Sequence, residues 1–289
     1  MRVLVTGASG FVGGAVARHL ASEPSTTVTV RVAVRRTVDP PRDVQVVNIS
    51  GLSHNTDWSD AVRGVSMVVH AAARVHVMEE KATDPLAEYR TTNVDGTMAL
   101  ARQAASAGVR RFVFLSSIKV NGEETPPDGP FTADTPPQPR DAYGMTKLEA
   151  EQALRALSRE TGMEVVIIRP VLVYGPGVKA NFRAMLRAVQ RGLPLPFGAV
   201  RNRRSLVALD NLVDLIACCT THPAAAGQTF LVSDGEDLST PELLRRAGEA
   251  MGKRAGLLPV PVPLMEIAGR MIGRRDMVRR LCGSLVVDI

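Results

Sequence analysis

Short apolar runs alternate with longer amphipathic stretches along the first 170 residues. The apolar runs are rich in Val, Ile and Phe, and they predict strands at 2–6, 28–34, 44–49, 66–70, 111–116 and 164–169. Helical spacing predicts helices at 11–22, 91–107 and 142–161, followed by a helix at 210–221 and a strand at 228–232. Because strands and helices alternate, the pattern predicts an α/β fold with a doubly wound parallel sheet.

Two kinds of segment interrupt this alternation. Residues 121–141 contain six prolines, which predicts a long loop. Residues 175–204 and 233–289 are richer in Gly, Pro and Arg, and their alternation is less regular. We therefore expect a main domain over 1–174, to which 205–232 returns, and a smaller C-terminal part that binds substrate. Ligands of open α/β sheets bind at the carboxyl edge of the strands.

Composition narrows the class of protein. Of the 289 residues, 45% are apolar and 22% are charged, as in a folded globular protein. The sequence opens on a strand pattern rather than a signal peptide and has no apolar run of about 18 residues, so we expect a cytoplasmic protein without membrane association. With a net charge of +6, 4% aromatic residues and no recognisable nucleic-acid module, a nucleic-acid partner is not expected. The cysteines and histidines lack metal-ligand spacing, so no metal site is expected.

A glycine-rich loop, TGASGFVG at 6–13, follows the first strand and opens the first helix. In this context Gly7 allows a tight turn, Gly10 lets the backbone approach a pyrophosphate, and Gly13 permits close helix–strand packing. The phosphates would lie on the N–H groups at the start of the helix. The loop predicts a dinucleotide-binding Rossmann domain, and the cofactor-binding residues expected in the loop are Gly7, Ser9, Gly10, Phe11, Val12 and Gly13.

The ends of the second and third strands bear on the choice of cofactor. Arg35 and Arg36 stand where a protein that binds NAD usually has an acidic residue for the ribose 2′-hydroxyl. Arginine at this place accommodates the 2′-phosphate of NADP, so NADP(H) is favoured over NAD(H). Asn48 and Ile49, at the end of the third strand, are candidate cofactor contacts, with Asn48 facing the adenine.

A catalytic constellation is predicted from Tyr143 and Lys147, which are four residues apart on one helix. Residues at this spacing share a face, and a nearby positive charge is expected to lower the pKa of a tyrosine. Such a tyrosine exchanges a proton with a carbinol oxygen. Ser117, at the end of the fifth strand, is expected to hydrogen-bond the same oxygen.

Taken together, these motifs make the chain resemble the extended short-chain dehydrogenases/reductases of the NAD(P)-dependent epimerase/dehydratase family. The resemblance covers nearly the whole chain. It rests on the loop at 6–13 and on the following segments: VVHAAA (68–73), NVDGT (93–97), FVFLSSIKVNGE (112–123), YGMTK (143–147), RPVLVYGPG (169–177) and RRSLVALDN (203–211). The sequence is most similar to the branch of UDP-4-keto-6-deoxy-N-acetylhexosamine 4-reductases, which also includes proteins similar to UDP-glucose 4-epimerase.

The family resemblance implies roles for particular residues. Catalysis falls to Ser117, Tyr143 and Lys147. The cofactor would also be lined by Ala71, Ala72, Ala73, Asn93, Tyr143, Lys147 and Pro170, and the substrate by Arg74, Ser117, Lys119, Asn181 and Arg203. Homodimers built from helices such as 91–107 and 142–161 are common in the family. Its members usually continue beyond a segment like 283–288, so we expect part of the substrate site to be missing or open.

The function that we expect is an NADPH-dependent 4-ketoreductase of a UDP-sugar. It would convert UDP-4-keto-6-deoxy-N-acetylglucosamine to UDP-N-acetylquinovosamine, or to its C4 epimer, for surface polysaccharide synthesis. Arg35 favours this reductase because the epimerases of the family usually have an acid there. A UDP-hexose or UDP-N-acetylhexosamine 4-epimerase using NAD remains an alternative, as do a reductase of other carbonyls and an NADP-binding regulatory protein without catalysis. A dehydratase is less favoured, because Ile118 and Lys119 follow Ser117 where dehydratases usually have Asp-Glu.

Overall fold

The computed structural model describes residues 1–22, 28–35, 44–75, 83–126, 129–178, 180–273 and 275–289. The chain divides into two compact units. The first comprises 1–122, 133–170 and 209–232, and the second comprises 123–132, 171–208 and 233–289. This division differs from the expected one at 123–132, 171–174 and 205–208, which all belong to the second unit. The reason is that β7 (Leu172–Tyr174) and β8 (Arg204–Ala208) pair with each other in a separate sheet.

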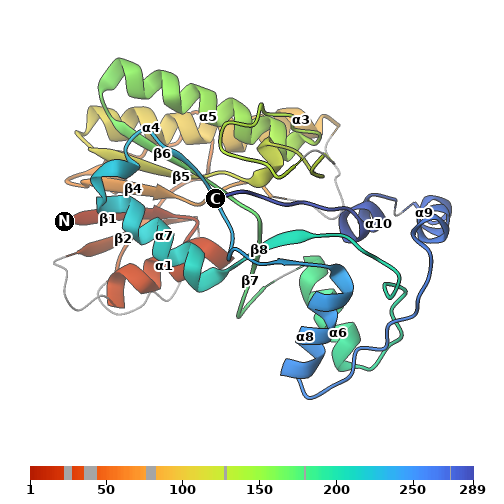
Figure 1. Cartoon of the computed structure of the whole chain (residues 1–289). Coiled ribbons are helices and arrows are strands. Elements are labelled where there is room, and N and C mark those ends of the chain that lie inside the picture. The colour runs from red at the N-terminus through yellow and green to blue at the C-terminus, as the bar shows by residue number, and fades with distance from the viewer. Residues whose placement is uncertain (23–27, 36–43, 76–82, 127–128, 179, 274) are drawn as a thin grey trace. The chain divides into compact units, whose positions relative to one another are not determined.

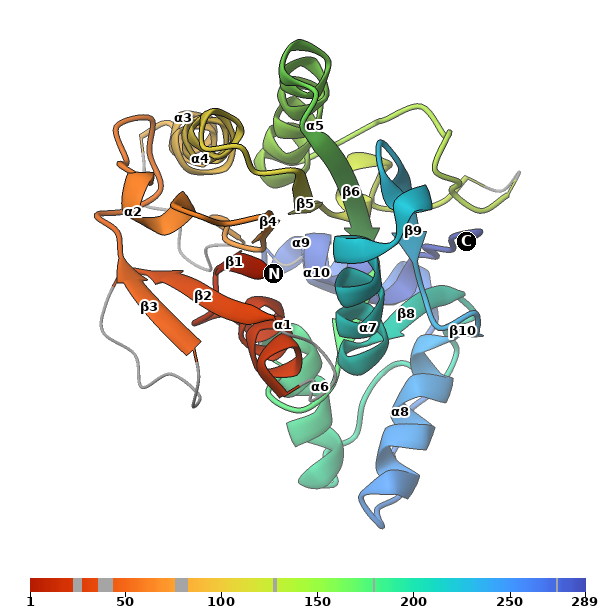
Figure 2. The same ribbon diagram turned by 90° about the vertical axis from the view of Figure 1, so that its left-hand side faces the viewer.

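The first unit is built on a seven-stranded parallel sheet with the order β3-β2-β1-β4-β5-β6-β9 (Figures 1 and 2). The strands are β1 (Arg2–Thr6), β2 (Thr29–Val34), β3 (Val44–Asn48), β4 (Met67–His70), β5 (Arg111–Leu115), β6 (Glu164–Pro170) and β9 (Thr229–Val232). The strand order reverses between β1 and β4, which confirms the doubly wound α/β fold and creates the crevice where such sheets bind ligands.

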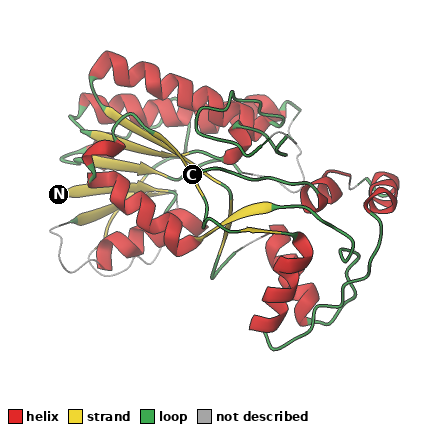
Figure 3. Ribbon diagram, in the orientation of Figure 1, coloured by secondary structure: helices red, strands yellow, loops and turns green. Residues whose placement is uncertain are grey.

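Helices cover both faces of this sheet (Figures 2 and 3). One face carries α1 (Phe11–Ser22) and α7 (Leu209–Thr221), and the other carries α2 (Ser59–Val62), α3 (Pro85–Arg90), α4 (Gly96–Ser106) and α5 (Ala142–Thr161). The helix predicted at 91–107 begins instead with a π-helical turn at Thr91–Asp95, before α4. Helix α5 has the predicted bounds, because the Asp141 carboxylate caps its start and Gly162, with φ of 75°, ends it.

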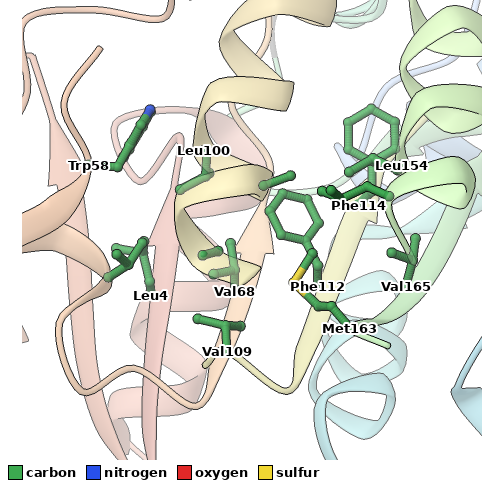
Figure 4. Close-up of a cluster of buried hydrophobic side chains, with 14 of the residues drawn as sticks. Leu4, Trp58, Val68, Leu100, Val109, Phe112, Phe114, Leu154, Met163 and Val165 are labelled. Carbon is green, nitrogen blue, oxygen red and sulfur yellow. The ribbon is translucent and has the colours of Figure 1, made fainter. Parts of the chain in front are cut away.

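The core of the first unit lies between the sheet and the helices α4 and α5 (Figure 4). Trp58, Leu100, Phe112 and Leu154 are fully buried there. Each buried side chain of this size stabilises the fold by about 1.5–3 kcal/mol relative to exposure. The apolar β-branched runs read from the sequence therefore form strands because both faces of the sheet are covered.

The second unit contains a small sheet with the order β10-β8-β7, where β10 is Asp237–Leu238. Its helices are α6 (Ala180–Gln190), α8 (Thr240–Ala250), α9 (Val262–Met271) and α10 (Arg275–Cys282). The buried amide of Asn202 donates hydrogen bonds to Thr240 Oγ1 at 3.1 Å and to the carbonyl oxygens of Leu281 and Gly283, which joins distant segments of this unit. Of the helices in the described part of the chain, none has the length and hydropathy needed to cross a membrane.

His70 is a buried polar residue in the middle of the sheet. Its ring nitrogens form hydrogen bonds with the hydroxyl oxygens of Thr6 at 2.7 Å and Thr97 at 3.0 Å. Burial, with a smaller contribution from the charge of Lys147, lowers the pKa of His70 to about 3. The imidazole is therefore neutral at physiological pH and acts as a fixed hydrogen-bonding link between β1, β4 and α4.

This burial predicts a pH dependence of stability. The folded pKa of His70 lies below its value in the unfolded chain, so the unfolded state takes up the proton first as pH falls. The stability that neutral His70 contributes is fully present above its unfolded pKa, and this contribution is lost as the pH falls toward its folded pKa. Between pH 7 and about pH 5, this group lowers the free energy of unfolding by about 2 kcal/mol. Urea denaturation at the two pH values should show a smaller loss in His70→Asn.

Phe112→Leu is the matched control, because Phe112 packs against the His70 ring, with centroids 5.8 Å apart, and carries no titratable group. Relative to the wild type, Phe112→Leu should lower the free energy of unfolding by the same amount at both pH values. An equal pH dependence in the wild type and His70→Asn would contradict the prediction.

Candidate active site

The glycine-rich loop brings three pieces of backbone into close approach. Gly7 has φ of 73°, and a Cβ atom placed on it would lie 2.7 Å from the backbone nitrogen of Ala72. A Cβ atom on Gly13 would lie 2.4 Å from the carbonyl oxygen of Gly7, and the N–H of Gly10 donates to that oxygen at 2.8 Å. Only residues without side chains fit at these places, which leaves the loop backbone and the start of α1 accessible to a pyrophosphate.

The other residues expected in this loop lie where a dinucleotide would need them. Ser9 is exposed, and Phe11 and Val12 form the first turn of α1, whose N–H groups have no partner within the helix. The residues present therefore fit a dinucleotide at the carboxyl edge of the sheet. The cofactor contacts of the individual side chains stay predictions.

Three further residues predicted to bind the cofactor, Arg35, Asn48 and Ile49, lie at the ends of β2 and β3. The two strands pair in parallel with Val34 opposite Asn48, so Arg35 and Ile49 leave the sheet together. The Ile49 N–H donates to the Val34 carbonyl at 2.9 Å, and Arg35 is exposed. Arg36 lies outside the described residues.

The segment after β4, with Ala71, Ala72 and Ala73 half-buried, is held by Asn93. Asn93 is 1% exposed and lies in the π-helical turn. Its Oδ1 accepts from the Arg74 N–H at 2.8 Å, and its Nδ2 donates to the Arg74 carbonyl and to Thr146 Oγ1, both at 3.1 Å. Asn93 therefore ties the end of β4 to α5, which is a bracing role that the sequence motif did not reveal.

The structure brings Ser117, Tyr143 and Lys147 together within the first unit. Ser117 follows β5, which ends at Leu115, and its side chain lies near enough to the Tyr143 phenol to affect its pKa. Tyr143 and Lys147 lie one turn apart on α5. The Lys147 ammonium lies 5.9 Å from the centre of the Tyr143 ring and donates to the Leu115 carbonyl at 2.8 Å. The predicted constellation is thus present as a cluster of side chains.

The electrostatics of this cluster differ from the sequence expectation. Burial and the nearby Asp141 carboxylate raise the pKa of Tyr143 above its ordinary value, with a smaller opposing effect from the Ser117 side chain. The expectation that Lys147 lowers this pKa is therefore wrong for the structure, because the ammonium is directed at the Leu115 carbonyl and is itself buried. Burial lowers the pKa of Lys147 to about 7, and the Glu151 carboxylate partly opposes this shift.

The residues expected to contact substrate fall in both units. In the first unit, Lys119 forms an ion pair with Asp141, and the Arg74 guanidinium lies 5.4 Å from the centre of the Tyr89 ring. Pro170, predicted to line the cofactor, is the buried last residue of β6. Asn181, in α6, and Arg203, just before β8, belong to the second unit, and their substrate contacts stay predictions.

Four buried residues beside Ser117 were not predicted from the sequence. They are Ser116, Asn121, Glu151 and Arg169, and all form one hydrogen-bonded group. Two signals were available. Arg169 interrupts an apolar strand, where a charge requires a partner, and Glu151 stands four residues after Lys147 on the same helix.

The second unit contains a hollow of about 530 Å³ whose wall includes Arg203, Arg279, Glu124 and Glu266. The Arg203 side chain is 72% exposed and forms an ion pair with Asp237 at 2.9 Å. Its guanidinium therefore keeps donors available for an anionic ligand. Among the described residues, no group of three or more His, Cys, Asp or Glu side chains is arranged to hold a metal ion.

Comparison with known proteins gives a consistent result. A sequence profile of the NAD dependent epimerase/dehydratase family matches residues 3–233. A UDP-glucose 4-epimerase of Vibrio cholerae is 47% identical over 288 residues, which are 99% of this chain and 87% of that protein.

Solved structures agree in fold. MoeE5 in complex with UDP-glucose and NAD superposes with a TM-score of 0.75 and 27% identity, over 89% of this chain and 84% of that one. A UDP-glucose 4-epimerase of Thermotoga maritima with UDP-glucose superposes with a TM-score of 0.76 over 100% of this chain and 90% of that one. At 20% identity, the second likeness concerns the fold.

The close approach at Gly13 predicts that Gly13→Ala weakens dinucleotide binding. The added Cβ would lie 2.4 Å from the Gly7 carbonyl oxygen, so α1 and the loop must separate. Overpacking of this kind costs about 1–3 kcal/mol, and we expect an affinity loss of about tenfold to a hundredfold. Calorimetric titration with NAD⁺ and NADP⁺ measures it.

The matched control is Gly256→Ala in the second unit. There the nearest atom to an added Cβ is 3.7 Å away, an ordinary contact. Equal affinities for Gly13→Ala and Gly256→Ala would show that the loop does not hold the dinucleotide.

Proposed function

This chain belongs to the NAD dependent epimerase/dehydratase family, and from that premise we propose that it reduces the C4 carbonyl of a UDP-linked 4-keto-hexose with NADPH. The observation that carries the proposal is the cluster of Ser117, Tyr143 and Lys147 at the edge of the sheet that also bears the glycine-rich loop. The nicotinamide supplies the hydride when it is bound.

The protonation state of Tyr143 fits the role of a proton donor. Because burial raises the pKa of Tyr143, the phenol keeps its proton at neutral pH. Reduction of a ketone requires a proton donor at the carbonyl oxygen, and Tyr143 is that donor. Ser117 orients the same oxygen by hydrogen bonding, and the Lys147 ammonium holds the cofactor ribose.

The substrate class is supported by the charge of the second unit and by the relatives. MoeE5 was solved with UDP-glucose, and the Vibrio cholerae relative is named for UDP-glucose. A nucleoside diphosphate carries two negative charges that arginine recognises through paired hydrogen bonds. Arg203, which lines the hollow of the second unit and is largely exposed, is the group that we assign to the diphosphate.

Arg35 supports NADP(H) as the cofactor. It is exposed at the end of β2, and β2 pairs with β1, the strand that precedes the glycine-rich loop. A guanidinium at this position attracts the 2′-phosphate, whereas a carboxylate would accept a hydrogen bond from the 2′-hydroxyl of NAD.

A 4-epimerase that uses NAD is the second candidate. It is favoured by the name of the Vibrio cholerae relative, which is 47% identical, and by the NAD bound in MoeE5. The same three side chains would serve it, with the tyrosine acting first as a base and then as an acid.

The two candidates are separated by the reaction that each catalyses. We expect rapid NADPH oxidation with UDP-2-acetamido-2,6-dideoxy-4-keto-hexose, followed by nicotinamide absorbance. Tyr143→Phe should lower the rate about 10²- to 10⁴-fold, because the proton donor is lost. Lys147→Met should also be strongly impaired, whereas Lys253→Met, at an exposed lysine, should keep the wild-type rate. Interconversion of UDP-hexoses with NAD, without NADPH oxidation, would replace the reductase with the epimerase.

The cofactor choice has its own test in Arg35→Asp. The wild type should prefer NADPH to NADH, and the variant should lose at least about tenfold of this preference, because one charge-assisted hydrogen bond is worth about 1.5–3 kcal/mol. The ratio of kcat/KM values for the two cofactors measures it. Arg110→Asp makes the same charge change just before β5, at the opposite edge of the sheet, and should leave the ratio unchanged. A wild type that prefers NADH would refute the role of Arg35.

A further inference from the structure

One buried ion pair holds both ends of the segment that carries Ser117. On the N-terminal side, Ser116 Oγ donates to Glu151 Oε1 at 2.5 Å. On the C-terminal side, Arg169 Nη1 donates to Asn121 Oδ1 at 3.1 Å. Between these two points lie Ser117 and the short 3-10 helix Ile118–Val120.

The ion pair between Glu151 and Arg169 is bidentate and almost completely enclosed. Arg169 Nε donates to Glu151 Oε1 at 3.0 Å, and Arg169 Nη2 donates to Oε2 at 2.5 Å. The Arg169 and Glu151 side chains are 5% and 1% exposed. A buried pair of this kind adds little net stability compared with a well-packed apolar pair, because both charges lose their hydration. We therefore look for the role of this ion pair in the fixed positions that its two hydrogen bonds give to Glu151 and Arg169.

The pair also joins β6 to α5 and to the segment after β5, which together carry the catalytic cluster. Glu151 lies on α5 one turn after Lys147, and Arg169 lies on β6. The backbone supports the same arrangement, since the Ser116 N–H donates to the Ile168 carbonyl at 2.7 Å and Lys147 donates to the Leu115 carbonyl at 2.8 Å. The start of the Ser117 segment is thus attached to both α5 and β6.

We propose that Glu151 and Arg169 form a positioning clamp, which holds residues 116–121 so that the Ser117 hydroxyl meets Tyr143. The clamp residues contact other protein groups and act through Ser117. The inference rests on the proposed function in assigning Ser117 to the substrate oxygen. Misplacement of such a group by about 1 Å costs about a hundredfold in rate.

The first unit contains a matched control in a second Arg–Glu pair, which joins β5 to β6. Arg111 Nε donates to Glu164 Oε2 at 2.6 Å, and Arg111 is buried. These residues are the first of β5 and β6, at the opposite end of the strands from Ser116 and Arg169. Five strand residues span about 17 Å, so this pair is remote from Ser117.

The test compares Glu151→Gln and Ser116→Ala with Glu164→Gln. We expect kcat to fall about a hundredfold in Glu151→Gln and about tenfold in Ser116→Ala, with KM changed by less than about twofold. Hydrogen–deuterium exchange of the peptide covering 116–122 should rise in both variants, because its amide hydrogen bonds lose their support. Glu164→Gln should keep the wild-type kcat and the wild-type exchange of this peptide.

Ser116→Ala removes one hydroxyl and leaves the ion pair intact, so it tests the clamp even where Glu151→Gln does not fold. The proposal is overturned if Ser116→Ala and Glu151→Gln keep the wild-type exchange of 116–122, or if Glu164→Gln raises it equally. A wild type inactive on every UDP-sugar would refute the proposed function, and the exchange comparison, which requires no substrate or cofactor, would then decide the clamp by itself.

Discussion

The parallel pairing of β1, β4 and β5 is the constraint on which the candidate site depends. Thr6 pairs with His70, and His70 pairs with Phe114, so three neighbouring strands end at one level of the sheet. Because parallel strands share their carboxyl edge, the loop after β1 and the segment carrying Ser117 leave the sheet at the same edge. The buried, neutral ring of His70 on β4 forms hydrogen bonds with Thr6 of β1 and Thr97 of α4.

Close backbone approach and buried charge then give this edge its chemistry. The contact between Gly7 and Gly13 leaves no room for side chains, and this keeps peptide N–H groups available at the start of α1. Tyr143 and Lys147, in contrast, are enclosed by other side chains. Burial raises the pKa of Tyr143 and lowers that of Lys147, and both shifts favour the neutral form of the group. A neutral phenol near a partly charged lysine is suited to donating a proton, so the burial of both side chains on α5 supports the role proposed for Tyr143.

The local sequence determined the strands, the bounds of α5, the glycine-rich loop and the placement of Tyr143 and Lys147 on one helix face. The period of apolar residues predicted the strands, and α5 has its predicted bounds because Asp141 and Gly162 are strong helix-end signals. The glycine spacing at 6–13 predicted a loop that fits a dinucleotide, because backbone conformation there depends on the absence of side chains. The four-residue spacing of Tyr143 and Lys147 placed them on one helix face for the same local reason.

Tertiary structure decided what depends on partners distant in sequence. From the sequence we expected the Lys147 ammonium to act on Tyr143, but it donates to the carbonyl of Leu115, 32 residues earlier. Burial raises the pKa of Tyr143, which is the reverse of the expected shift. The pairing of Glu151 with Arg169 and the separate sheet of the second unit also arise only on folding. Hydration, dielectric environment and hydrogen-bond partners are properties of the packed chain. The local sequence pattern therefore identifies the candidate reactive side chains, whereas packing determines their protonation states and orientations.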